Sequence, residues 1–400
     1  MNLFIAESLG CCIDGGDKRK NKTRSQISMK INSLHRLSYL NKIILIAVSS
    51  VLLIVPLWVK AQANNTGLGL PSAIYTENPS TLAKNQLGQK LFFDKRLSRD
   101  GSISCATCHQ PEKAFSDGLV VAKGIGGHLG TRNTPNLLNA VFNQTQFWDG
   151  RRPTLESQAL DPFVNPQEHG LPNHQALIDI LRSDPEYLSA FQTVFRVGPN
   201  MIDAKHVGQA IASFERTLIS GDSPFDRYFF NGDHSALSRS AENGLQLFQG
   251  RARCATCHTI EETSALFTDN QFHSLNIGIR RIESRLSEIT MRLARLKESG
   301  AHLDHALLSD NDIAELGRFA VTFKPSDIGK FRTPSLRNVG RTAPYMHDGS
   351  VGSLEDAVDI ELYYRSAEAG RPLVLTPLEK SDLVQFLKSL NSPLNPFFVP

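Results

Sequence analysis

The chain has 400 residues, of which 40% are hydrophobic and 21% charged, and a formal net charge of +3 at pH 7. The basic excess lies near the start, because residues 64–400 hold 34 Lys and Arg against 37 Asp and Glu, a net charge of −3. This balance argues against nucleic-acid binding, and residues 64–400 are numerous enough for two domains.

The first distinctive segment is the apolar run 43–59, IILIAVSSVLLIVPLWV. Lys30, Arg36 and Lys42 precede it, and Ala61-Gln62-Ala63 follows it, which is typical of a signal peptide with its cleavage site. The run is shorter than the about 20 residues of a membrane-spanning helix, so an uncleaved anchor is the alternative. Residues 1–63 therefore predict an exported protein, with either Met1 or Met29 as its true start.

Two copies of one pentapeptide come next, Cys105-Ala106-Thr107-Cys108-His109 and Cys254-Ala255-Thr256-Cys257-His258. Their flanks repeat as well, since Gly88-Gln-Lys-Leu-Phe precedes the first copy and Gly244-Leu-Gln-Leu-Phe precedes the second. This repetition predicts a duplicated unit in which an amphipathic helix leads into a turn.

The pattern C-x-x-C-H is the attachment signature of c-type haem, in which both sulfurs form thioethers and the histidine ligates the iron. A thioredoxin-type redox pair or half of a zinc site would also use C-x-x-C. Neither alternative explains a histidine that follows immediately in both copies. We therefore expect two covalently bound haem c groups, with His109 and His258 as iron ligands.

Between the motifs lies Trp148, in Phe147-Trp148-Asp149-Gly150-Arg151, and it is the only tryptophan after residue 64. A tryptophan usually fills a core, but this one stands between two redox centres and could relay electrons. Gln158 and Glu168 follow. On the open face of a haem, a carboxylate could move a proton during peroxide cleavage and an amide could position the oxidant.

The rest of the chain predicts a mainly α fold with two cytochrome c-like haem domains in tandem and few strands. The turn formers between Gly221 and Ser235 suggest a boundary between an N-terminal domain, 64–230, and a C-terminal domain, 231–400. Helical periodicity is visible at 175–182, 204–218 and 377–390. A further amphipathic helix at about 282–299, marked by Ile282, Leu286, Ile289, Leu293 and Leu296, is an insertion that either packs on the surface or binds a partner.

Taken in order, these motifs resemble the bacterial dihaem cytochrome c peroxidase family, including its MauG-type members. The resemblance covers about residues 83–390. It includes Leu91–Ser98 (LFFDKRLS), Arg132–Pro135 (RNTP), Phe147–Arg151 (FWDGR), Pro166–Glu168 (PQE), Arg332–Val339 (RTPSLRNV) and Thr342–Gly349 (TAPYMHDG), besides the two haem motifs.

The resemblance implies a division of labour between the haems. The haem on His109 would be peroxidatic, with Glu168, Gln158 and Trp148 as catalytic residues. The haem on His258 would receive electrons from a small cytochrome c or cupredoxin. The resemblance also implies a periplasmic location, a homodimer, and a calcium ion held by Asn133, Thr342 and Pro344, whose oxygen ligands suit that cation.

The sixth ligand of each iron stays open. His128, in a glycine-rich loop, is the candidate for a removable ligand of the first iron. At the second iron, the family has a methionine, or a tyrosine in MauG-type members, as the ligand. Counting onward from the TAPY motif, that position corresponds to Glu361, and a shift of one or two residues along the helix would bring Tyr363 there instead. Met346 is the nearest methionine in sequence.

Three functions are therefore compatible with the sequence. The first is a peroxidase that reduces hydrogen peroxide to water. The second is a MauG-type oxidase that uses peroxide to oxidise a protein or organic substrate, which the absence of methionine at residue 361 favours. The third is a non-enzymatic dihaem electron carrier, against which the set of Trp148, Gln158 and Glu168 argues.

Overall fold

The computed structural model describes residues 68–72 and 77–393, which belong to one compact unit. The predicted signal peptide or anchor at 43–59 lies outside the described residues. Within them, no helix is both long and apolar enough to cross a membrane.

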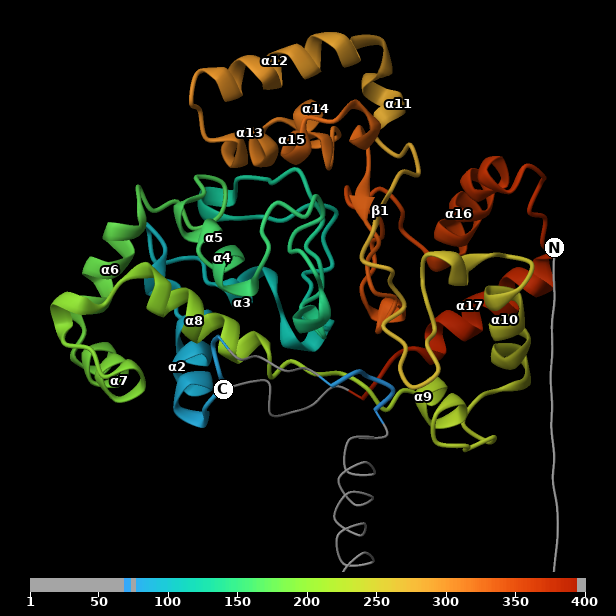
Figure 1. Cartoon of the computed structure of the whole chain (residues 1–400), viewed down its shortest axis with the longest axis horizontal. Coiled ribbons are helices and arrows are strands. Elements are labelled where there is room, and N and C mark those ends of the chain that lie inside the picture. Colours follow the sequence, from blue (N-terminus) through green and yellow to red (C-terminus); the bar gives the residue numbers. More distant parts are fainter. Residues whose placement is uncertain (1–67, 73–76, 394–400) are drawn as a thin grey trace, which may run out of the picture. The chain divides into compact units, whose positions relative to one another are not determined.

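The described chain is mostly helical (Figure 1), which confirms the predicted fold class. Its helices are α2 (Leu82–Phe93), α3 (Cys105–Cys108), α4 (Leu155–Gln158), α5 (Asp161–Val164), α6 (His174–Ser183), α7 (Pro185–Phe195), α8 (Ala204–Glu215), α9 (Pro224–Phe229), α10 (Arg239–Gln249), α11 (Ile279–Ile282), α12 (Leu286–Glu298), α13 (Leu303–Ser309), α14 (Asn311–Ala314), α15 (Phe319–Thr322), α16 (Leu354–Ala369) and α17 (Pro377–Ser389). Its strands are β1 (Phe272–His273) and β2 (Phe331–Arg332), which pair antiparallel.

The long helices begin where the sequence provides capping residues. Thr81, Asp203 and Ser238 each accept a backbone hydrogen bond at the start of α2, α8 and α10. At α17, Thr376 and Glu379 form a reciprocal capping box with proline as the first helical residue. Such caps satisfy amide groups that a helix start otherwise leaves without partners.

Two helix pairs repeat the same packing, α2 with α8 and α10 with α17. Gly88 of α2 lies so close to α8 that a Cβ atom would collide with the carbonyl oxygen of Ala210. Gly244 of α10 lies in the same way against the carbonyl oxygen of Asp382. Phenylalanine pairs flank both crossings, Phe92 with Phe214 (5.2 Å between ring centres) and Phe248 with Phe386 (4.9 Å). The glycines of the repeated flanks thus allow the helix backbones to approach closely.

The described chain contains three main hydrophobic cores. The first is built from residues between Leu87 and Leu218, and the second from residues between Phe225 and Leu390. The third belongs to the insertion and includes Ile282, Ile289 and Leu293. These residues carry the predicted amphipathic pattern, so the apolar face of α12 packs against α13 and α14.

A second repeated element is a tight loop that occurs once in each half of the described chain. Residues 146–152 and 345–351 each close through an antiparallel bridge at their ends. Phe147 and Met346 occupy the same place in the two loops, and both have a positive φ, 67° and 73°. Trp148 and His347 follow them, so this pair of loops presents different side chains from one shared backbone form.

Candidate active site between two haem cavities

The first Cys-Ala-Thr-Cys-His motif (residues 105–109, called the first CATCH motif) borders a cavity of about 140 Å³. Its lining includes Cys105, Cys108 and His109 together with all three predicted catalytic residues, Trp148, Gln158 and Glu168. Gln158 ends α4 and Glu168 lies in the turn after α5, where its amide donates to the carbonyl of Asn165 (3.1 Å). Short helices and turns therefore bring residues nearly 60 positions apart in sequence into one wall.

His109 is oriented by the backbone. Its Nδ1 lies 2.9 Å from the carbonyl oxygen of Phe115, which leaves Nε2 as the ring nitrogen free for a metal. Burial lowers the pKa of His109, which favours the neutral imidazole that a metal requires. A carbonyl that bonds to one ring nitrogen in this way fixes the tautomer of a histidine whose other ring nitrogen binds a metal.

Glu168 lines this cavity with a carboxyl of raised pKa. Burial raises the pKa of its carboxyl to about 7, and the nearby Arg151 guanidinium counteracts part of this rise. Arg151 is held in place by Asp149 (3.1 Å) and by the ring of Phe147, which lies 3.4 Å from it. A carboxyl with a pKa near neutrality is suited both to accept and to return a proton.

The second CATCH motif opens onto a larger cavity of about 260 Å³, lined by Cys254, Cys257 and His258. His258 Nδ1 lies 2.8 Å from the carbonyl oxygen of Phe267, which repeats the arrangement at His109. Burial is the largest cause that lowers the pKa of His258. Burial also raises the pKa of the Cys254 thiol to about 12.

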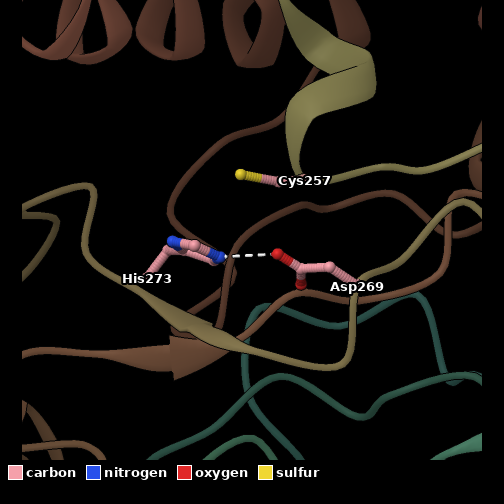
Figure 2. A group of neighbouring side chains, drawn as sticks. All are labelled: Cys257, Asp269 and His273. Atoms are coloured by element: carbon pink, nitrogen blue, oxygen red, sulfur yellow. Dashed lines mark hydrogen bonds and ion pairs between the residues drawn. The ribbon is translucent and has the colours of Figure 1, made fainter. Parts of the chain in front are cut away.

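Beside the second motif, the Sγ of Cys257 faces the pair formed by His273 and Asp269 (Figure 2). His273 Nε2 lies 2.8 Å from Asp269 Oδ2. A cysteine, a histidine and a carboxylate at this spacing could ligate a metal ion. Because Cys257 belongs to a haem-attachment motif, we interpret His273 and Asp269 as a polar pair at the edge of the second haem cavity.

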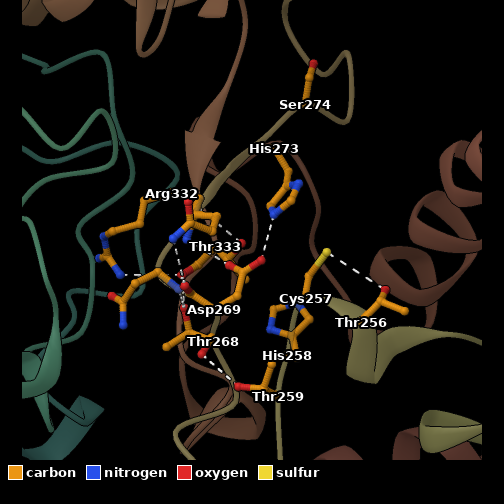
Figure 3. A network of polar contacts seen from close by, with 12 residues as sticks. Thr256, Cys257, His258, Thr259, Thr268, Asp269, His273, Ser274, Arg332 and Thr333 are labelled. Atoms are coloured by element: carbon orange, nitrogen blue, oxygen red, sulfur yellow. Dashed lines mark hydrogen bonds and ion pairs between the residues drawn. The ribbon is translucent and has the colours of Figure 1, made fainter. Parts of the chain in front are cut away.

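The wall between the two cavities contains Trp148, which lines both. Its indole Nε1 donates to the carbonyl of Asn133 (2.9 Å), and its own carbonyl accepts from the amide of Arg332 on β2 (2.8 Å). Figure 3 shows Arg332 on the side of Thr333 and Asp269 that faces away from His258. A half-buried indole, held by hydrogen bonds at its ring nitrogen and its carbonyl, thus forms part of the wall between the two cavities.

The candidate sixth ligands lie in different environments. Glu361 and Met346 line the second cavity. Tyr363 does not line it and is 64% exposed, in contact with Arg280 and Tyr364. His128 is exposed and does not line the first cavity. The structure thus favours Glu361 over Tyr363 at the second iron, and ligation by His128 stays a prediction that requires its loop to move.

The three predicted calcium ligands, Asn133, Thr342 and Pro344, all line the second cavity. The side-chain amide of Asn133 donates to the carbonyl of Leu119 (2.8 Å), which leaves its side-chain oxygen as a donor atom for a cation. The donor set consists of neutral oxygens, which calcium accepts.

Several cavity residues were not predicted from sequence. Glu215 of α8 and His169 line the first cavity and are buried, and Arg332 lines both cavities. Burial raises the pKa of Glu215 to about 8 and lowers that of His169 to about 4. Arg332 belongs to the RTPSLR motif, so the sequence singled it out as part of a pattern. Glu215 ends helix α8, whose sequence has no feature that distinguishes this glutamate.

The donor set fits haem at both places. Each cavity combines two unpaired cysteines, a buried neutral imidazole with one ring nitrogen fixed by a carbonyl, and an apolar wall. These features define a protein with two c-type haem sites.

Comparison with known proteins agrees with this definition. Residues 82–235 match the family described as di-haem cytochrome c peroxidase. The chain is 37% identical over 322 residues to the methylamine utilization protein MauG of Methylorubrum extorquens, which covers 79% of this chain and 80% of that protein. It is 36% identical over 314 residues to the cytochrome c551 peroxidase of Pseudomonas aeruginosa, covering 78% and 80%.

Among solved structures, a MauG-like protein associated with microbial copper homeostasis is 31% identical with a TM-score of 0.63, covering 81% of this chain and 94% of that one. The diheme peroxidase BthA of Burkholderia thailandensis shares the fold, with a TM-score of 0.62 at 22% identity over 81% of this chain and 92% of that one. The chain therefore belongs to the di-haem cytochrome c peroxidase family, as its sequence motifs predicted, and two haem groups are its cofactors.

Proposed function

We propose that the protein is a peroxidase that reduces hydrogen peroxide, with two electrons and two protons, to two molecules of water. The observation that carries this proposal is the shared cavity of His109, Gln158 and Glu168. Around this one space lie the imidazole that we propose as the iron ligand, an amide, and a carboxyl whose pKa burial raises to about 7. The similarity to the cytochrome c551 peroxidase of Pseudomonas aeruginosa and the matched family support the same activity.

Glu168 and Gln158 have different roles in this reaction. When bound, the haem on His109 supplies the iron at which the oxygen–oxygen bond is cleaved. The Glu168 carboxylate would accept a proton from one peroxide oxygen and return it to the departing oxygen, which leaves as water as the oxygen–oxygen bond breaks. The Gln158 amide donates a hydrogen bond to the departing oxygen as its negative charge develops. Burial of the cavity strengthens both interactions.

Electrons enter, in this proposal, at the second cavity and cross by way of Trp148 to the first. The donor is a small redox protein, a cytochrome c or a cupredoxin. Trp148 is suited to this path because it lines both cavities and hydrogen bonds at its indole and its carbonyl hold it in place. The two functional domains of this proposal are 64–230 and 231–400. The two hydrophobic cores divide a little earlier, between Leu218 and Phe225, so α9 packs with the second domain.

The test is a Glu168→Gln variant, which keeps the shape of the side chain and removes its base. We expect peroxide turnover with reduced cytochrome c to fall by about 10²-fold or more, while the haem content measured as pyridine haemochrome stays at the parental value. Glu112→Gln, at an exposed glutamate, is the matched control and should keep full turnover. Parental turnover in Glu168→Gln would overturn the proposal.

A MauG-type oxidase is the second candidate, and one observation favours it. Glu361, not a methionine, occupies the ligand register on α16 and lines the second cavity. An anionic oxygen ligand lowers the potential of a haem, whereas methionine raises it, and a low-potential second haem is a poor acceptor for a cytochrome donor. Glu361→Gln and the control Tyr363→Phe distinguish the ligands: a change in the oxidised optical and electron paramagnetic resonance spectra of the first variant alone identifies Glu361. A spectrum with methionine ligation that neither variant alters would assign Met346.

Three finer features belong to this proposal. The protein acts in the periplasm, either free or held by residues 43–59, and it forms a homodimer, which sedimentation velocity can check. A calcium ion bound by Asn133 with the carbonyls of Thr342 and Pro344 stiffens the wall beside Trp148. Chelation should then lower the thermal midpoint of the haem-loaded protein, and added calcium should restore it.

A further inference from the structure

Arg332 carries a buried positive charge without a matching negative one. It is 8% exposed, and its guanidinium bonds only neutral oxygens, Asn143 Oδ1 (3.1 Å) and the carbonyl of Thr333 (3.4 Å). Its Nε atom is buried without a hydrogen-bond partner in the described structure. Burial lowers the pKa of Arg332 to about 10, with no carboxylate contributing. An isolated charge in such a position is costly unless an anion accompanies it.

Two other buried arginines show how this protein normally compensates a buried positive charge, which is with a nearby carboxylate. Arg337 forms a two-pronged ion pair with Asp226 (2.9 Å for each bond) and also donates to two backbone carbonyls. Arg132 also has buried nitrogens, Nε and Nη1, without hydrogen-bond partners in the described structure, but the carboxylate of Asp149 lies 3.8 Å away and the carbonyl of Ala314 accepts from its Nη2. Against these two, the missing anion at Arg332 indicates a group that is supplied from outside the polypeptide.

The position of Arg332 identifies the chemistry of that group. Seven residues line both haem cavities, and Arg332 is the only charged one among them. Its amide is bonded to the carbonyl of Trp148, so the side chain projects from the wall that separates the cavities. A haem carries propionate carboxylates, and a planar guanidinium is the side chain best matched to carboxylates in a buried place.

We propose that Arg332 is a shared counter-ion that binds propionate carboxylates of both haems across the wall between the cavities. The proposal rests on the two bound haems of the proposed function, but not on the reaction that they catalyse. One positive charge held near both irons favours the reduced state of each haem, so both redox equilibria depend on the same side chain. Arg332 is therefore a positioning residue rather than one that touches peroxide.

The test measures the haems and not the turnover. Arg332→Gln and Arg332→Lys are prepared as haem-loaded proteins and titrated by optical spectroelectrochemistry, with resonance Raman spectra of the propionate bending bands. At the parental midpoint potentials, we expect Arg332→Gln to lower the ratio of reduced to oxidised haem about tenfold at both haems, the size expected for one charge acting over roughly 10 Å of protein. Arg332→Lys keeps the charge and should shift less, but its Raman bands should move because the two-pronged contact is lost.

Arg253→Gln is the control, because Arg253 is exposed and lines only the second cavity. It should leave the first haem unchanged and shift the second by less than Arg332→Gln does. Unchanged potentials and Raman bands in both folded Arg332 variants would overturn the proposal, and so would a shift confined to one haem. If the parental protein fails to turn over peroxide while both potentials still respond to Arg332, the proposed function is wrong and the counter-ion stands.

Discussion

The two halves of the described chain build the same haem-binding frame and then differ on its open side. Each half has a glycine at its helix crossing, Gly88 or Gly244, and a histidine fixed by a phenylalanine carbonyl. Asn139 and Asn338 adopt the same left-handed backbone form (φ 63° in both) and both bond to Ser220, the residue that joins the halves. The features needed to hold a haem are thus kept in duplicate.

The residues that differ line the two cavities away from the haem motifs. The first cavity has Glu168, whose carboxyl has a pKa of about 7. The second has Glu361, which is paired with Arg365 at 3.3 Å. The loop position held by Trp148 in the first half is held in the second by His347, which is bonded to Glu315 (2.8 Å). We infer that duplication supplied the frame, and that a few substitutions assigned catalysis to one half and electron entry to the other.

The strongest way to break this comparison is to remove one haem at a time. The double variant Cys254→Ala/Cys257→Ala should lose the second haem, because both thioethers are gone. Its pyridine haemochrome content should fall to one haem per chain. Turnover with reduced cytochrome c should vanish while the first haem still reacts with peroxide. The reciprocal variant Cys105→Ala/Cys108→Ala should lose that reaction with peroxide, and equal behaviour of the two variants would refute the division of labour.

The helix crossings offer a test of how alike the frames are. Gly88→Ala and Gly244→Ala each place a Cβ atom against a backbone carbonyl that cannot move aside. We expect each to lower the free energy of unfolding by about 1–3 kcal/mol, the usual cost of overpacking, measured by chemical denaturation of the haem-loaded protein. Gly198→Ala is the control, since nothing lies within 4 Å of its added Cβ. A large effect in one half only would show that the two crossings are not equivalent.

Much of this site could be predicted from the sequence, because its parts are local. The haem motifs, Trp148 and Glu168 each stand within a short recognisable pattern, and the family resemblance implies Gln158. Residues of both haem motifs and these three residues line the cavities. The choice between Glu361 and Tyr363 as the candidate iron ligand required the orientation of α16, which the sequence alone does not give. Two residues along α16 turn a side chain by about 200°, so Tyr363 points away while Glu361 and Arg365, four apart, share the cavity face. The role of Arg332 could not be predicted, because a missing counter-ion is visible only once all neighbours are in place.

The last prediction distinguishes the two cavities by the pH dependence of kcat/KM for peroxide. Since burial raises the pKa of Glu168 above its usual value, to about 7, the carboxyl is largely protonated at pH 6 and ionised at pH 8. The base that peroxide cleavage requires is the ionised form, so kcat/KM for peroxide should rise about tenfold per unit of pH below 7 and level off above it. Glu168→Gln should lose this dependence, whereas Glu361→Gln should retain it, because Glu361 faces the other cavity. A profile that keeps its bend near pH 7 in Glu168→Gln would assign the titration to another group, and buried Glu215, with a raised pKa of about 8, would then be the next carboxyl to replace.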